Sequence, residues 1–113
     1  MLTKTEIPKN QVIKKFKEIL TDSAIEYEKV FLFGSRAGSQ YNEDSDWDFL
    51  VVLKNAIASG LKRKLRSELR VKFHDYYPVY PIDIIVKDIT TFENEKNILN
   101  TISNEAFQKG IEA

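Results

Sequence analysis

Residues 46–53 of the sequence read DWDFLVVL, and this stretch decides the fold. Its apolar part is typical of a buried strand. Side chains alternate across a strand, so Asp46 and Asp48 project from one face while Trp47 projects from the other. A buried carboxylate without a partner is costly, and two neighbouring carboxylates also repel each other. The two aspartates therefore indicate a function, because a core strand alone would not require them.

A second apolar segment carries the same anomaly. Residues 82–86 read IDIIV, so Asp83 stands among aliphatic residues. If the two strands are neighbours, the three carboxylates converge and raise one another's pKa values. Mg²⁺ would relieve this repulsion, since it prefers hard oxygen ligands and leaves positions open for substrate phosphates. Paired metal ions are a recurrent device in phosphoryl and nucleotidyl transfer, so Asp46, Asp48 and Asp83 are the candidate ligands of such a metal site.

A glycine-serine pair follows an earlier apolar run. Residues 30–33, VFLF, predict another buried strand, and it ends at Gly34. Glycine allows close approach of the backbone to a ligand, and successive N–H groups at a turn can hold a phosphate. The hydroxyl of Ser35 adds a donor, and Arg36 adds a fixed positive charge. We therefore expect these three residues to bind a nucleoside triphosphate through its phosphates.

The remaining pattern completes a small α/β domain. Apolar residues at helical spacing predict helices over residues 8–21 and 58–74. Thr90 or Thr91 is expected to cap a last helix that runs to about residue 107. The predicted order is helix, strand, strand, helix, strand, helix.

Composition limits the class of protein. The 113 residues suit one domain, so we expect a single domain over residues 1–113. Lys plus Arg equals Asp plus Glu at 17 each, which argues against non-specific nucleic-acid binding as the main function. No cysteine and one histidine exclude a disulfide framework and a structural zinc site. Residues 1–11 lack a signal-peptide core and no apolar run could span a bilayer, so we expect a cytoplasmic protein.

These motifs resemble those of a known family. FLFGSR at residues 31–36, SDWDFLVVL at residues 45–53 and a third aspartate on a later strand resemble the nucleotidyltransferase superfamily that includes DNA polymerase beta. The chain is most similar to the minimal nucleotidyltransferase branch, over roughly residues 10–108. Members often read GSRARG, whereas residues 34–39 here read GSRAGS and lack the second arginine. The resemblance implies a mixed sheet with helices mainly on one face and the acidic cluster on the other.

The resemblance also implies roles and a partner. Ser35 would contact the triphosphate, and the first two aspartates would hold both metals. Asp83 would complete the site and help to activate the attacking hydroxyl. In the minimal branch the partner is an all-helical HEPN-domain protein, often a toxic ribonuclease. The nucleotidyltransferase acts there as antitoxin, in several cases by adding AMP to a tyrosine hydroxyl of the toxin, with ATP as the substrate.

Two other functions fit the same sequence. A catalytically silent protein of this fold would neutralise its partner by binding alone. An RNA-binding module would use the basic face of the second helix, which carries Lys62, Arg63, Arg66 and Arg70. Larger relatives use an extra domain to bind the acceptor, and the chain is too short to contain one. We therefore expect the missing surface to come from a partner chain or from self-association, and nucleic acid is not the expected partner.

Overall fold

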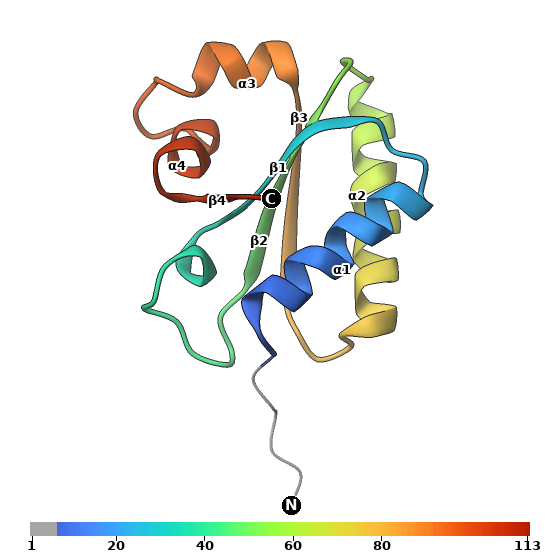
Figure 1. Ribbon diagram of the computed structural model, residues 1–113. Coiled ribbons are helices and arrows are strands. Elements are labelled where there is room, and N and C mark those ends of the chain that lie inside the picture. The colour runs from blue at the N-terminus through green and yellow to red at the C-terminus, as the bar shows by residue number, and fades with distance from the viewer. Residues whose placement is uncertain (1–6) are drawn as a thin grey trace, which may run out of the picture.

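The computed structural model describes residues 7–113, which form a sheet with helices on both faces (Figure 1). Residues 1–6, part of the segment for which the sequence predicts no signal peptide, lie outside the described residues. The elements are α1 (Lys9–Asp22), β1 (Tyr27–Phe33), the 3₁₀ turn η1 (Ser35–Ala37), β2 (Trp47–Leu53), α2 (Ser59–Tyr76), β3 (Ile82–Asp88), α3 (Ile89–Glu95), α4 (Ile102–Lys109) and β4 (Ile111–Glu112). No helix in this part of the chain is both long and apolar enough to cross a bilayer.

The sheet has the strand order β3-β2-β1-β4. β1 runs antiparallel to β2 and to β4, whereas β2 and β3 are parallel and are connected through α2. Asp48 is directly opposite Phe33 in β1 and Asp83 in β3. The α/β class and the three predicted strands are confirmed, while the two-residue strand β4 was not predicted.

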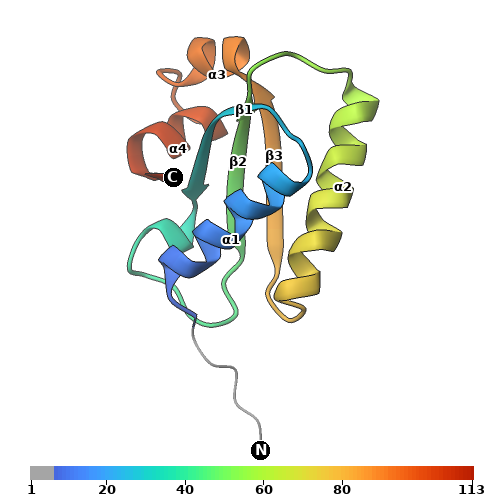
Figure 2. The ribbon, with the colours of Figure 1, turned by 45° about the vertical axis from the view of Figure 1, so that its right-hand side comes forward.

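The larger part of the core lies between the sheet and the helices α1 and α2, which Figure 2 shows together on one side. The rings of Phe16 from α1 and Phe49 from β2 stack with their centroids 4.0 Å apart. Trp47 is only 1% exposed, as expected for a side chain that points away from the aspartates. Alternation along β2 therefore sends Trp47 and Phe49 into this core and leaves Asp48 on the opposite face.

The two long helices share the first face, as expected, and the shorter helices α3 and α4 cover part of the opposite face (Figure 1). Phe31 from β1 stacks on Phe92 from α3, with ring centroids 5.4 Å apart. The predicted single helix to about residue 107 is wrong, because the chain forms two helices there. Asn100 takes a positive φ of 69° in the connection, and Leu99 is 79% exposed.

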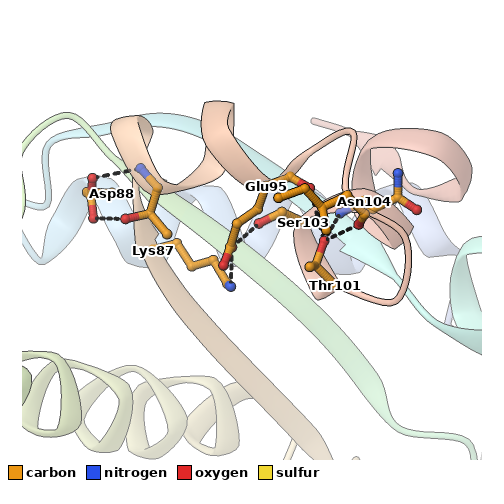
Figure 3. Close-up of polar contacts among 8 residues, drawn as sticks. Lys87, Asp88, Glu95, Thr101, Ser103 and Asn104 are labelled. Carbon is orange, nitrogen blue, oxygen red and sulfur yellow. Dashed lines mark hydrogen bonds and ion pairs between the residues drawn. The ribbon is translucent and has the colours of Figure 1, made fainter.

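A polar network holds these two helices against β3 (Figure 3). The carboxylate of Glu95 in α3 accepts hydrogen bonds from Lys87 in β3, at 2.6 Å, and from the Ser103 hydroxyl in α4, at 3.0 Å. The hydrogen bond from Lys87 lowers the pKa of Glu95. The Thr101 side chain caps α4 by accepting a hydrogen bond from the Asn104 amide. The network therefore fixes α4 relative to the sheet.

The cap of α3 is Asp88, not Thr90 or Thr91 as the sequence suggested. Its carboxylate accepts hydrogen bonds from the Thr91 amide at 3.0 Å and from the Thr91 hydroxyl at 2.8 Å. These bonds lower the pKa of Asp88. Thr91 contributes as a donor, and the exposed Thr90 lies outside the cap.

Replacing the cap should destabilise the protein measurably. We predict that Asp88→Ala lowers the free energy of unfolding by about 1 kcal/mol, because the first-turn amide loses its acceptor. Since the folded-state pKa of Asp88 is lowered, its contribution is full above its ordinary pKa of 3.8 and is lost as pH falls through the folded value. Urea unfolding at neutral pH measures the change. Thr90→Ala is the matched control and should have little effect; equal losses in both variants would contradict the assignment.

Candidate active site

The turn after β1 has a backbone conformation that strongly favours glycine. Gly34 has φ of 73°, a region that L residues with a side chain rarely adopt. A Cβ atom at this position would also collide with the Asp48 carboxylate. The chain then enters η1, where the Ala37 amide donates to the Gly34 carbonyl at 3.1 Å. The turn thus brings its backbone directly against the carboxylate, with the Ser35 side chain exposed beside it.

Asp48, which lies against this turn, has two further aspartates near it. Asp48 and Asp83 are paired in register on the adjacent parallel strands β2 and β3. Asp46 lies immediately before β2, on the same side of the chain by strand alternation. Asp46 and Asp83 are exposed, whereas Asp48 is half-buried. The register thus places Asp48 beside Asp83, as expected for neighbouring strands, whereas the convergence of all three carboxylates on one metal site stays a prediction.

A fourth carboxylate, Glu105 of α4, was missed by the sequence analysis. Its Oε2 atom accepts a hydrogen bond from the Gly34 amide at 3.1 Å, across 71 residues of chain. In the sequence, Glu105 is visible only as an acidic residue in the first turn of a helix. Acidic residues are common there because they interact favourably with the helix dipole, so this position does not by itself indicate a functional site. Only the packing of α4 against β1 reveals that this residue reaches the glycine turn.

Burial and neighbouring negative charges disfavour the charged form of Asp48. Its pKa is raised from 3.8 to about 6, first by burial and then by the negative charges of Asp46, Asp83 and Glu105. A carboxylate surrounded by others gains most from a cation, which favours the charged form. The site therefore contains oxygen ligands of the kind that divalent ions prefer, and a bound ion would reduce the repulsion among its carboxylates.

The donor set fits Mg²⁺ in its chemistry, because carboxylate oxygens are the ligands that this ion prefers. Within residues 7–113, however, no group of three or more His, Asp or Glu side chains is already arranged around a common point as a metal site. Exposed aspartates can change rotamer at small cost, so Asp46 and Asp83 are free to turn toward an ion.

Arg36 occupies a different place from the one expected. Its side chain is fully buried, and its guanidinium donates to the carbonyls of Ser45, at 3.2 Å, and Glu43, at 3.1 Å. The guanidinium also lies over the Trp47 ring, 4.4 Å from its centroid, and over the Tyr41 ring at 4.9 Å. This geometry fastens the loop between β1 and β2. A phosphate contact would require Arg36 to leave these partners.

Two hollows flank the acidic cluster. One has a volume of about 690 Å³ and includes Glu105 in its lining, together with polar residues of the α3–α4 connection. The other has a volume of about 360 Å³ and includes Asp83 in its lining, together with arginines of α2. Each hollow thus meets the acidic cluster at one carboxylate, Glu105 in the first and Asp83 in the second.

Comparison with known proteins explains this arrangement. Residues 14–105 match the family described as polymerase beta, nucleotidyltransferase. The chain belongs to this nucleotidyltransferase family. No protein of curated function matches it.

Solved structures of similar fold come from toxin–antitoxin pairs. One, a toxin–antitoxin pair with AMP-PNP, has a TM-score of 0.63 at 18% identity, with 93% of this chain and 72% of that chain covered. Another, the pair MntA–HepT, has a TM-score of 0.59 at 16% identity, covering 92% and 70%. A third, from Shewanella oneidensis, is a tri-AMPylated HEPN toxin in complex with MNT antitoxin, with a TM-score of 0.58 at 16% identity and coverage of 93% and 71%. At these identities the similarity establishes the fold alone.

The first prediction for the site concerns Gly34. We expect Gly34→Ala to weaken binding of Mg²⁺ with a non-hydrolysable ATP analogue more than Ser35→Ala does. The alanine strains a positive φ by about 1–3 kcal/mol and displaces the Asp48 carboxylate, whereas Ser35→Ala removes one hydroxyl. Isothermal titration calorimetry measures both affinities. Gly60→Ala is the control, because nothing lies within 4 Å of a Cβ there. Unchanged affinity in Gly34→Ala would refute the turn as a phosphate site.

The second concerns the strain at Asp48. Because its folded pKa is raised to about 6, the protonated form favours folding below pH 3.8, and this contribution is lost as pH rises through 6. In metal-free buffer, Asp48→Asn should therefore gain stability over the wild type at pH 8 but not at pH 4. After allowance for solvent screening we expect a gain of about 1–2 kcal/mol. Thermal unfolding at both pH values measures it.

Asp75→Asn, an exposed carboxylate at the end of α2, is the matched control and should show no such dependence on pH. If Asp48→Asn differs from the wild type by the same free energy of unfolding at both pH values, the raised pKa of Asp48 is ruled out.

Proposed function

We propose that this protein transfers AMP from ATP to a hydroxyl group of a partner protein in the cytoplasm, and that it acts as the antitoxin of a HEPN-domain toxin. The observation that carries the proposal is the pairing of Asp48 with Asp83 beside the Gly34 turn. In a member of the nucleotidyltransferase family, this arrangement combines metal ligands with a backbone suited to phosphates. The proposed unit is the single domain over residues 1–113.

Each residue has a role that its position allows. The exposed Ser35 hydroxyl and the amides of the turn would bind the triphosphate. Asp46, Asp48 and Asp83 would hold two Mg²⁺ ions, which neutralise the phosphate charge and polarise the reacting oxygens when bound. Asp83, exposed at the edge strand, would face the acceptor hydroxyl and favour loss of its proton. Arg36 would act indirectly by fixing the loop that leads to Asp46.

Glu105 would reorganise when nucleotide binds. Its carboxylate now accepts the Gly34 amide, which the proposed phosphate contact needs. A phosphate would compete for this donor and would be repelled by the negative charge of Glu105. Movement of Glu105 away from the turn, or its recruitment by a metal ion, would remove that conflict.

The partner is proposed from two kinds of support. Similar structures contain an MNT antitoxin with a HEPN toxin, one of them tri-AMPylated, and another contains AMP-PNP. In this protein the acidic cluster is open to solvent at Asp46 and Asp83, so a large acceptor can reach it. The AMPylated toxin of the similar complex supports a protein as the acceptor, and the exposure of Asp46 and Asp83 is compatible with one.

Intact-mass spectrometry of the partner tests the proposal. The HEPN-domain protein from the same genome is incubated with ATP, Mg²⁺ and the purified protein. We expect a mass increase of about 329 Da per transferred AMP. Asp83→Asn should abolish the increase, because the acceptor hydroxyl loses the group that favours its deprotonation.

Asp75→Asn is the control. Asp75 is an exposed carboxylate in the last turn of α2 and has no role in the proposed site, so this variant should retain transfer. Gel filtration of the same mixtures reports complex formation independently of chemistry. Tight binding with no mass change in the wild-type reaction would contradict transfer and would favour the silent binding protein.

A further inference from the structure

The basic face of α2 forms one wall of the hollow that contains Asp83. Arg63, Arg66 and Arg70 are spaced by three and four residues, so they lie on one face of the helix. Figure 2 shows α2 alongside β3, the edge strand of the sheet. The hollow, here named the arginine groove, is lined by Arg63, Arg66, Ser67, Arg70, Asp83 and Ile84. The groove is therefore continuous with the acceptor side of the proposed active site.

The three guanidinium groups lack partners in the part of the chain that the structure describes. None of them forms an ion pair or a side-chain hydrogen bond with another of residues 7–113. Arg63 and Arg70 are exposed, and Arg66 is half-buried. Guanidinium presents a planar fork of donors that matches a carboxylate or a phosphate with two parallel hydrogen bonds. The groove thus offers several unused donor pairs to an anion.

The form of the groove does not suit a nucleic acid. Its outermost arginines are seven positions apart, which is about 10 Å along a helix and too short to follow a nucleic-acid backbone. Among residues 7–113 no aromatic side chain lines it, so bases would find no surface there for stacking. The equal numbers of basic and acidic residues also leave no strong positive field around the chain.

The surroundings suit a protein surface instead. Ser67 also lines a second hollow of about 270 Å³, which it shares with Glu68, Val71 and Lys72. The Val71 side chain is 63% exposed there, although it is apolar. Arginine beside exposed apolar residues is a composition typical of protein–protein interfaces.

We propose that the arginine groove docks the acceptor protein through an acidic segment that flanks the hydroxyl receiving the nucleotide. Carboxylates of the acceptor pair with Arg63, Arg66 and Arg70. The negative charge of Asp83 keeps carboxylates away from the end of the groove, so the neutral hydroxyl takes that position. This proposal rests on the proposed function for the chemistry at Asp83, whereas the docking requires the groove alone.

Fluorescence anisotropy with two labelled peptides tests the docking without any catalysis. The peptides are Glu-Glu-Tyr-Glu-Glu and Gln-Gln-Tyr-Gln-Gln, and the probe for the alternative is a labelled single-stranded oligouridylate. We expect the acidic peptide to bind about tenfold tighter than the neutral one, with an affinity that falls as salt is added. Arg63→Glu with Arg70→Glu should abolish this preference.

Lys64→Glu is the matched control, since Lys64 is exposed on the same helix but does not line the groove. It should leave the preference for the acidic peptide within about twofold of wild type, because exposed charges outside the groove contribute little. Arg70→Lys keeps the charge but loses the planar fork, so it should weaken binding partially. Circular dichroism confirms that each variant is folded.

Equal binding of the two peptides, or equal losses in the groove variant and in Lys64→Glu, would overturn the proposal. Tight binding of oligouridylate that the groove variant abolishes would also overturn it, in favour of an RNA surface. Peptide binding is measured without ATP or Mg²⁺, so it is scored separately from transfer. A failed transfer reaction with intact peptide binding would thus count against the proposed function and not against the docking.

Discussion

The parallel register of β2 and β3 places Asp48 directly beside Asp83, and the site depends on this pairing of like charges. Apolar neighbours enforce it, because Phe49 and Ile84 must enter the main core from the same strands. A slip of one residue would turn each apolar side chain to the wrong face of the sheet. The core therefore holds two carboxylates together that would otherwise separate, and burial raises the pKa of Asp48 to about 6. A bound cation would convert this unfavourable arrangement into a stable one.

The glycine turn, the loop before β2 and helix α4 are all positioned around the Asp48–Asp83 pair. Gly34 directly follows Phe33, which pairs with Asp48, and its missing side chain leaves room for the Asp48 carboxylate. Arg36 secures the following loop by filling a space between Trp47 and Tyr41 and by donating to loop carbonyls. The Lys87–Glu95–Ser103 network holds α4 so that Glu105 reaches the turn. Buried polar groups thus serve to position the exposed acidic side chains.

Local patterns predicted the strands and the aspartates, since alternation with period two is encoded within a few residues. The features that sequence analysis missed depend on contacts between distant segments. β4 has two residues and exists only by pairing with β1, and Glu105 meets Gly34 across 71 residues. Arg36 was expected at a phosphate because its charge is visible in the sequence, whereas the aromatic rings around it come from separate segments. The chain turns at Asn100, between α3 and α4, where φ is positive. No glycine stands near Asn100 in the sequence to indicate such a turn.

The pKa of the Asp48 carboxyl, followed by carbon-13 NMR with and without Mg²⁺, tests the central claim most directly. The carboxyl should titrate near pH 6 in metal-free protein, because burial and three neighbouring carboxylates disfavour its charged form. With Mg²⁺ and a non-hydrolysable ATP analogue, the same signal should shift to a pKa below its ordinary value of 3.8. An Asp48 carboxyl that titrates at its ordinary value in metal-free protein, and does not respond to Mg²⁺, would contradict a cation-dependent acidic site.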